Sequence, residues 1–227
     1  MATLDLAELD IRTVNRRLQG RTGDPNESAF EVLHPMGRHT LAAGINRPID
    51  VTIRGHVGYY CAGMNQQARV TVEGNAGVGV AENIMSGEVR VQGYASQSAG
   101  ATGHGGLVVI EGDASARCGI SIKGVDIVVG GSVGAMSGFM AQFGTLVVLG
   151  DAGADLGDSI YEARLYVRGK VESLGADCIE KEMRDEHRQQ LAELLERAGM
   201  DARPEEFRRY GSARQLYNFK VGNIGYY

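Results

Sequence analysis

The sequence contains no tryptophan, only three cysteines, and few aromatic residues, which make up 6% of its 227 positions. The cysteines show no C-x-x-C spacing, so neither a disulfide framework nor an iron–sulfur site is indicated. No apolar run approaches the length of about 20 residues that a membrane-spanning helix needs. The first residues also lack the apolar stretch of a secretory signal. We therefore expect a cytoplasmic protein with reduced cysteines.

Positive charge is also in short supply. Lysine and arginine together number 23 against 28 acidic residues, which gives a formal net charge of −5. Proteins that bind nucleic acid or anionic membranes through charge present a basic patch or stripe. The even spread of basic residues therefore predicts neither nucleic acid nor a membrane as a partner.

Glycine, by contrast, is abundant, with 33 residues, and it recurs with a period of 19. Seven apolar segments end in the glycines of this series, which are Gly55, Gly74, Gly93, Gly112, Gly131, Gly150 and Gly169. The residues four and two positions before each glycine are aliphatic in every repeat, from Val51 and Ile53 to Leu165 and Val167. Alternate residues of a strand point to opposite faces, so these fourteen side chains are expected to line a core.

The rest of each repeat fixes the fold class. About a dozen residues return from each glycine to the next strand, and they show no helical period. Small residues recur two and seven positions after the glycine, as at Ala76 and Ala81. Crossovers between parallel strands are right-handed, and a period of 19 does not fit the left-handed hexapeptide helix. The sequence predicts an all-β, single-stranded right-handed parallel β-helix of seven 19-residue coils over residues 49–177.

Both open ends of such a stack need a cap. Residues 1–48 are expected to form an N-terminal cap and docking arm, with a strand at AFEVL, residues 29–33. A short helix is expected there around Leu9, Thr13, Arg16 and Arg17. Residues 178–227 are expected to form a C-terminal α-helix and a partner-binding tail.

The C-terminal helix is predicted from about Cys178 to Ala198, with Asp177 as its N-cap and Gly199 as its stop. Its apolar face would consist of Ile179, Met183, Leu191, Leu194 and Ala198. The tyrosine-rich segment 210–227 has an irregular pattern and suits a segment laid on a partner surface.

Several motifs resemble ligand or catalytic sites but have simpler structural explanations. The glycine loops 74–79 and 100–106 resemble dinucleotide-binding turns, yet no helical pattern follows them. Cys61 and Cys118 lie three coils apart, roughly 14 Å in a β-stack, which is too far for a disulfide or a shared metal. The five histidines show no metal-binding spacing, and Glu73 and Glu111 lie two coils apart. We therefore predict no catalytic, cofactor-binding or metal-binding residue in this chain.

The segment GYYCAGMNQQ, residues 58–67, is the most unusual return path, because two tyrosines and three amide side chains interrupt a series of small residues. One interpretation is a contact or channel-lining surface. The other is stacking of aromatic and amide side chains between coils. Both remain open from the sequence.

Residues 49–178 resemble the glycine-rich "GXGXG" β-helix domain that closes the large subunit of glutamate synthase. The resemblance rests on GHVGYYCAGMNQQ, GNAGVGVAENIMSG, ASQSAGATGHGG, ARCGISIKGVDIVVGG and GDSIYEARLYVRGKVESLGADC. Over nearly the whole chain, including the segment RRYGSARQLY, it is similar to the small β-helix subunit of N-methylglutamate synthases. No catalytic residue is carried over from this family to the chain.

The resemblance implies a non-catalytic structural subunit of a glutamate synthase-like enzyme of methylamine metabolism. Its partners would be a class II glutamine amidotransferase-like subunit and an FMN-binding subunit, the latter also a candidate for an iron–sulfur cluster. This chain would bind no cofactor itself. The implied reaction converts methylamine and L-glutamate to N-methyl-L-glutamate and ammonia, and the β-helix would position the two partners or line a channel for ammonia or methylamine.

Two alternatives remain. One is the β-helix subunit of a different complex, of the formylmethanofuran dehydrogenase kind, whose partner binds molybdenum or tungsten. The other is an independent saccharide-active β-helix enzyme, which would require a cluster of carboxylates on one outer face.

Overall fold

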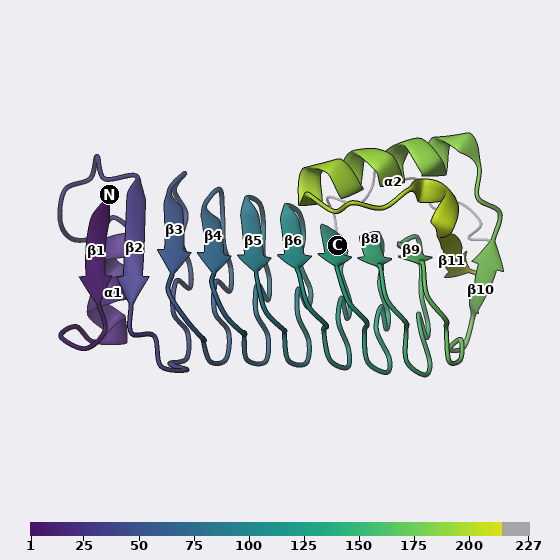
Figure 1. Ribbon diagram of the computed structural model, residues 1–227, viewed down its shortest axis with the longest axis horizontal. Coiled ribbons are helices and arrows are strands. Elements are labelled where there is room, and N and C mark those ends of the chain that lie inside the picture. Colours follow the sequence, from purple (N-terminus) through teal and green to yellow (C-terminus); the bar gives the residue numbers. More distant parts are fainter. Residues whose placement is uncertain (215–227) are drawn as a thin grey trace.

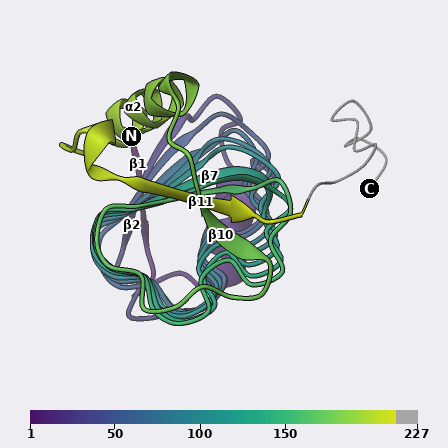
Figure 2. The same ribbon diagram turned by 90° about the vertical axis from the view of Figure 1, so that its right-hand side faces the viewer.

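The computed structural model of the protein describes residues 1–214, which form a solenoid that advances from the N-terminus towards the C-terminal helix (Figure 1). One 11-stranded sheet runs along it, in the order β1-β2-β3-β4-β5-β6-β7-β8-β9-β11-β10. Seen from the C-terminal end, the successive coils superimpose (Figure 2). No helix in this part of the chain is long and apolar enough to span a bilayer.

Seven strands carry the 19-residue repeat. They are β3 (Asp50–Ile53), β4 (Arg69–Val72), β5 (Glu88–Val91), β6 (Leu107–Ile110), β7 (Lys123–Val129), β8 (Phe143–Val148) and β9 (Arg164–Val167). Neighbouring strands are parallel and pair residues 19 apart, as in Val51 with Val70 and Val70 with Val89. The predicted fold class, a right-handed parallel β-helix of seven coils, is confirmed.

The predicted core residues lie inside the coils. All fourteen aliphatic side chains at the two inward positions, from Val51 to Val167, are at most 1% exposed. A second row of parallel bridges follows the glycine corner, joining the residues two positions after each glycine from Val57 to Val171. Stacked aliphatic side chains and coil-to-coil hydrogen bonds therefore hold the solenoid together.

The N-terminal segment continues the same sheet. Strands β1 (Ala2–Asp5) and β2 (Ala29–Leu33) add to it in parallel, and the strand predicted at AFEVL is confirmed. The predicted helix exists as α1 (Ile11–Leu18), with Asp10 as its N-cap. The buried residues of α1 are Val14 and Leu18, which join the main core. The prediction located the helix by Leu9, Thr13, Arg16 and Arg17 and did not identify these two inward-facing residues. Val14 and Leu18 share the buried face because they are four residues apart and therefore lie on the same side of the helix.

The C-terminal segment differs from the prediction at its start. Residues Cys178–Lys181 form strand β10, and helix α2 begins only at Asp185 and ends at Ala198. Strand β10 pairs antiparallel with β11 (Arg208–Ser212), which also pairs with β9. The predicted helix start at Cys178 and the cap at Asp177 are therefore wrong, because distant strand pairing overrides local helical preference. Asp177 instead forms an ion pair with Arg214.

The predicted stop of the helix at Gly199 is confirmed, with a left-handed φ of 69°. A short 3₁₀ helix, Pro204–Glu206, leads from it to β11. Of the predicted apolar face, Leu191, Leu194 and Ala198 are buried, whereas Ile179 lies in β10 and is exposed. Of the predicted tail 210–227, residues 210–212 belong to strand β11, and residues 215–227 lie outside the described residues.

Helix α2 covers the outer face of the last coils (Figure 1). The outward position three residues before each repeat glycine is Thr52, Thr71 and Arg90 in the first coils and becomes apolar in the later ones. These later side chains form a second core with α2, made of Val109, Val128, Val147, Tyr166, Leu191, Leu194, Leu195 and Ala198. The boundaries 1–48, 49–177 and 178–227 remain a prediction, since one sheet continues through all three segments.

Candidate functional site: a tyrosine, methionine and arginine face

The segment GYYCAGMNQQ places three large side chains on the outside of the first full coil. Tyr59, Tyr60 and Met64 are 50%, 46% and 54% exposed. Large apolar and aromatic side chains on a soluble protein mark contact surfaces when they gather at one place. The first of the two interpretations, a contact surface, is therefore the one that this geometry favours.

The backbone explains why these side chains point outward. Tyr60, Ala62 and Met64 all have left-handed φ values, 59°, 54° and 57°. Their N–H groups donate alternately to the next coil and the previous one: to Val78 O at 2.8 Å, Leu41 O at 2.9 Å and Glu82 O at 2.8 Å. Ala62 between them is fully buried. The exposed side chains thus stand on a backbone that is hydrogen-bonded on both sides.

His39 fixes the orientation of the first tyrosine. Its Nδ1 atom accepts a hydrogen bond from the Tyr59 N–H at 2.8 Å. Its ring stacks on the Tyr59 ring with the centroids 4.5 Å apart. The two rings therefore form an ordered aromatic pair at the surface.

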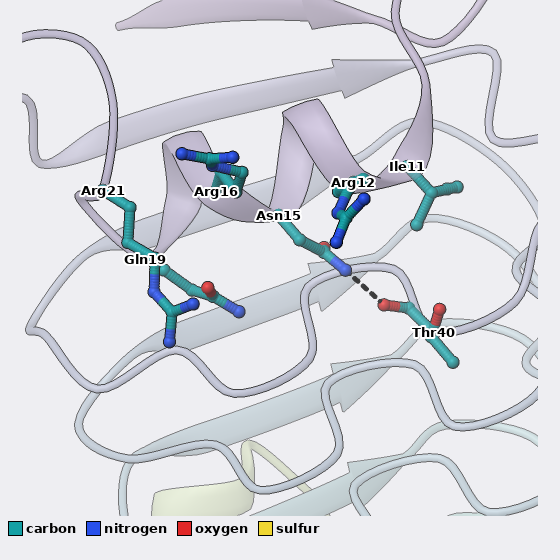
Figure 3. A pocket seen from close by; sticks show the side chains of 7 residues that line it. All are labelled: Ile11, Arg12, Asn15, Arg16, Gln19, Arg21 and Thr40. Carbon is teal, nitrogen blue, oxygen red and sulfur yellow. Dashed lines mark hydrogen bonds between the residues drawn. The ribbon is translucent and has the colours of Figure 1, made fainter.

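A groove of about 660 Å³ lies beside this coil, along α1 (Figure 3). Asn15 anchors α1 there, donating to Thr40 O at 2.7 Å and accepting from Ala42 N at 2.8 Å. The groove also carries Arg12, Arg16 and Arg21. The neighbouring Arg17 and Arg54 form salt bridges with Glu27 and Glu31. By contrast, the three arginines of the groove form no ion pair with any of residues 1–214.

The groove and the tyrosine surface adjoin each other. Thr40, which lines the groove, donates its N–H to Tyr59 O at 2.7 Å. We name the combined surface the docking face and define it as Arg12, Arg16, Arg21, Tyr59, Tyr60 and Met64. Arginine, tyrosine and methionine are the residue types enriched in protein–protein interfaces, where tyrosine and arginine supply most hot spots.

The cysteines are packing residues. Cys61, Cys118 and Cys178 are free thiols and buried. Burial raises the pKa of Cys61 and Cys118 to about 12 and that of Cys178 to about 11. Since the thiolate is the nucleophile and the metal ligand, these side chains are held in their unreactive form.

The histidines have separate structural surroundings. His34 contacts Asp5 at 2.7 Å, and Nδ1 of His56 accepts a hydrogen bond from the Asn75 N–H at 2.9 Å. His187 is buried in α2, and His104 is exposed. Within residues 1–214, no group of three or more histidine, cysteine or acidic side chains is placed to hold a metal.

The carboxylates on the outer face alternate with arginines. Arg54 pairs with both Glu31 and Glu73, and Arg90 contacts Glu88 and Glu111 at 3.3 Å. Such partly exposed pairs form a solvated face. The structure thus keeps Glu73 and Glu111 in separate ion pairs rather than bringing them together.

The glycine loops serve coil packing. A Cβ atom on Gly77 would lie 2.6 Å from the carbonyl carbon of Gly58 in the previous coil. The close approach of two backbones therefore requires glycine in loop 74–79. No helix follows this loop or loop 100–106, so neither has the geometry of a dinucleotide site.

Sequence reasoning missed two features. One is a ladder in which the side chain directly after a repeat glycine accepts the N–H of the same position one coil later, as for Asn75 to Tyr94, Asp113 to Ser132 and Asp151 to Lys170. Its signal was the recurrence of short polar residues at this position. The other is the arginine groove, which the i, i+4 spacing of Arg12 and Arg16 indicated.

No protein-family model matches the chain. Protein GlxC of Rhizobium meliloti (strain 1021) is 61% identical over 228 residues, which cover 100% of both chains. The chain belongs to the GlxC family. Identity of this extent over the full length means that Protein GlxC shares the coiled fold described for residues 1–214.

Proposed function

We propose that this chain is a non-catalytic architectural subunit of a multi-subunit, glutamate synthase-like enzyme in the cytoplasm. The observation that carries the proposal is the docking face, an ordered aromatic and arginine surface on a rigid solenoid whose core is closed by α1 at one end. A rigid scaffold suits the positioning of partners, because little conformational entropy is lost when they bind.

The finer form of the proposal names the complex. In it, the chain binds a class II glutamine amidotransferase-like subunit and an FMN-binding, glutamate synthase-like subunit, in an N-methylglutamate synthase that converts methylamine and L-glutamate to N-methyl-L-glutamate and ammonia. The likeness of the repeat segments to the "GXGXG" domain supports this form. FMN would be held by the partner, and this chain would contribute surfaces rather than reacting groups.

Co-purification tests the proposal. The tagged chain is expressed in its native host, purified by affinity, and analysed by mass spectrometry and by the absorption spectrum of the eluate. We expect two larger subunits, one amidotransferase-like and one flavoprotein, in a fixed ratio to this chain. A molybdenum or tungsten protein in their place would favour the formylmethanofuran dehydrogenase-like complex, and a solitary chain with activity on saccharides would favour the independent enzyme.

Matched variants locate the contact. The double variant Tyr60→Ser, Met64→Ser is expected to lose at least one of the two subunits while its melting temperature stays within a few degrees of the parent, because both side chains are exposed. The control is Leu174→Ser, which changes an exposed apolar residue at the other end of the solenoid. Equal recovery of both subunits by the double variant and the control would contradict the role of the docking face.

A further inference from the structure

A second cleft, separate from the docking face, lies between α2 and the outer face of β7, β8 and β9. Its volume is about 330 Å³. Its walls come from the middle and C-terminal turns of α2 and from residues on or next to the three strands. The polar and charged side chains that matter for its chemistry are Asp126, Thr145, Glu162, Arg164, Tyr166 and Arg197.

Tyr166 presents a buried hydroxyl without a partner. The residue is 1% exposed, and its hydroxyl makes no hydrogen bond with any of residues 1–214. Leaving such a group unsatisfied costs about 1–3 kcal/mol. Burial raises the pKa of Tyr166, so the hydroxyl keeps its proton and is available as a donor. An acceptor supplied from outside the chain would satisfy it.

Two arginines, Arg164 and Arg209, and one carboxylate, Glu186, are the charged groups that act on the Tyr166 hydroxyl, so its surroundings carry an excess of positive charge. Arg164 lies two residues before Tyr166 on the same face of β9, and its guanidinium contacts the side chain of Gln190 rather than a carboxylate. Arg209 is the residue opposite Tyr166 in β11. A neutral donor beside arginine guanidinium groups is the arrangement that recognises a carboxylate.

The rest of the cleft carries three carboxylates, Asp126, Glu162 and Glu193, against one arginine, Arg197. Asp126 lies 3.5 Å from Arg197, and Glu162 forms no ion pair within the described chain. Glu193, on α2, also lines this part of the cleft. Glu162 and Arg164 are two residues apart, and their Cα atoms are therefore separated by about 7 Å along the chain. One small molecule can reach both charges.

We infer that this cleft binds a small zwitterion of the α-amino-acid class. Its carboxylate is received by Arg164 and the Tyr166 hydroxyl, and its ammonium group by Glu162. A simple carboxylate would leave the acidic wall facing an anion, and a simple amine would leave the Tyr166 hydroxyl unpaired. The inference concerns this chain alone and does not rest on the proposed function.

Binding to the purified full-length chain tests the inference. The twenty common L-amino acids are screened by saturation-transfer NMR, and the tightest binder is measured by calorimetry beside the amine and the acid that lack its carboxylate or its ammonium group. We expect the amino acid to bind about tenfold or more tightly than either analogue, as for the loss of one charged contact. Absence of binding by every amino acid, or equal binding of the acid analogue, would overturn the inference.

Conservative variants assign the contacts. Tyr166→Phe is expected to weaken binding up to about tenfold, because one hydrogen bond is lost, and to leave the melting temperature of the unliganded chain unchanged or higher. Arg164→Gln should weaken binding of the amino acid and its acid analogue alike, whereas Glu162→Gln should weaken binding of the amino acid and its amine analogue but not of the acid analogue. Tyr59→Phe is the control. Undiminished binding by Tyr166→Phe would show that the hydroxyl is only hydrated and would overturn the assignment.

Discussion

The glycine that ends each coil strand is predicted to be irreplaceable because of close packing between coils, and Gly150→Ala tests this directly. Gly150 has no left-handed φ. A Cβ atom at this position would lie 2.6 Å from the carbonyl carbon of Gly131 and 2.7 Å from its oxygen. The N–H of Gly150 donates to the same oxygen at 2.8 Å. The added methyl group therefore pushes apart the two backbones that this hydrogen bond joins.

The expected cost follows from these contacts. Overpacking that moves backbone costs about 1–3 kcal/mol, and weakening one coil-to-coil hydrogen bond adds about 1 kcal/mol. The sum is about 2–4 kcal/mol, which lowers the melting temperature by roughly 4–16 °C for a domain of this size. Thermal and urea unfolding followed by circular dichroism would measure the loss.

The matched control is Gly119→Ala. Gly119 has a left-handed φ of 69°, but a Cβ atom there would meet nothing closer than Cδ1 of Ile127 at 3.4 Å. The conformational cost of about 1–2 kcal/mol is partly offset by about 0.8 kcal/mol from burial of the methyl group. We expect Gly119→Ala to stay within about 1 kcal/mol of the parent. If both variants lost the same stability, or Gly150→Ala lost none, close backbone approach would not be the reason for the period.

Three further predictions concern the caps and the core. Burial, with Arg209 nearby, lowers the pKa of His187 below its ordinary value of 6.5. The neutral ring therefore contributes stability above about pH 6.5 that is lost on acidification. In urea titrations, His187→Gln should lose less stability than the parent between about pH 7 and pH 5. Iodoacetamide at about pH 8 should leave the native chain unmodified and add three groups in urea, as read by intact mass, because all three thiols are buried; modification of the native chain would contradict this packing. Leu194→Ala should cost about 2–4 kcal/mol and loosen α2, whereas the exposed Glu196→Ala should cost little, as measured by urea unfolding.

Much of the fold could be predicted from the sequence because the repeat combines two independent signals. The glycine period sets the coil length, and the aliphatic residues at Val70 and Val72 and their equivalents identify the inward face. Both signals are local, since each coil contacts mainly its neighbours. The outward position from Thr52 to Tyr166 also changes from polar to apolar residues, a signal of where α2 packs that the prediction did not use.

The caps were harder to predict because their structure depends on contacts between distant residues. Residues 178–181 pair with residues 209–212, and no local pattern distinguishes this strand from the first turn of a helix. The same holds for the cleft beneath α2. Tyr166 occupies the outward position of the repeat, and its hydroxyl becomes buried only because α2 covers it.

Native mass spectrometry of the complex purified through the tagged chain, with the absorption spectrum of the same sample, tests the central claim most directly. The account predicts one assembly that contains this chain and two larger subunits, carries a flavin spectrum, and releases this chain free of cofactor when it dissociates. A mass equal to that of the chain alone, from a sample without flavin absorption, would contradict the architectural role.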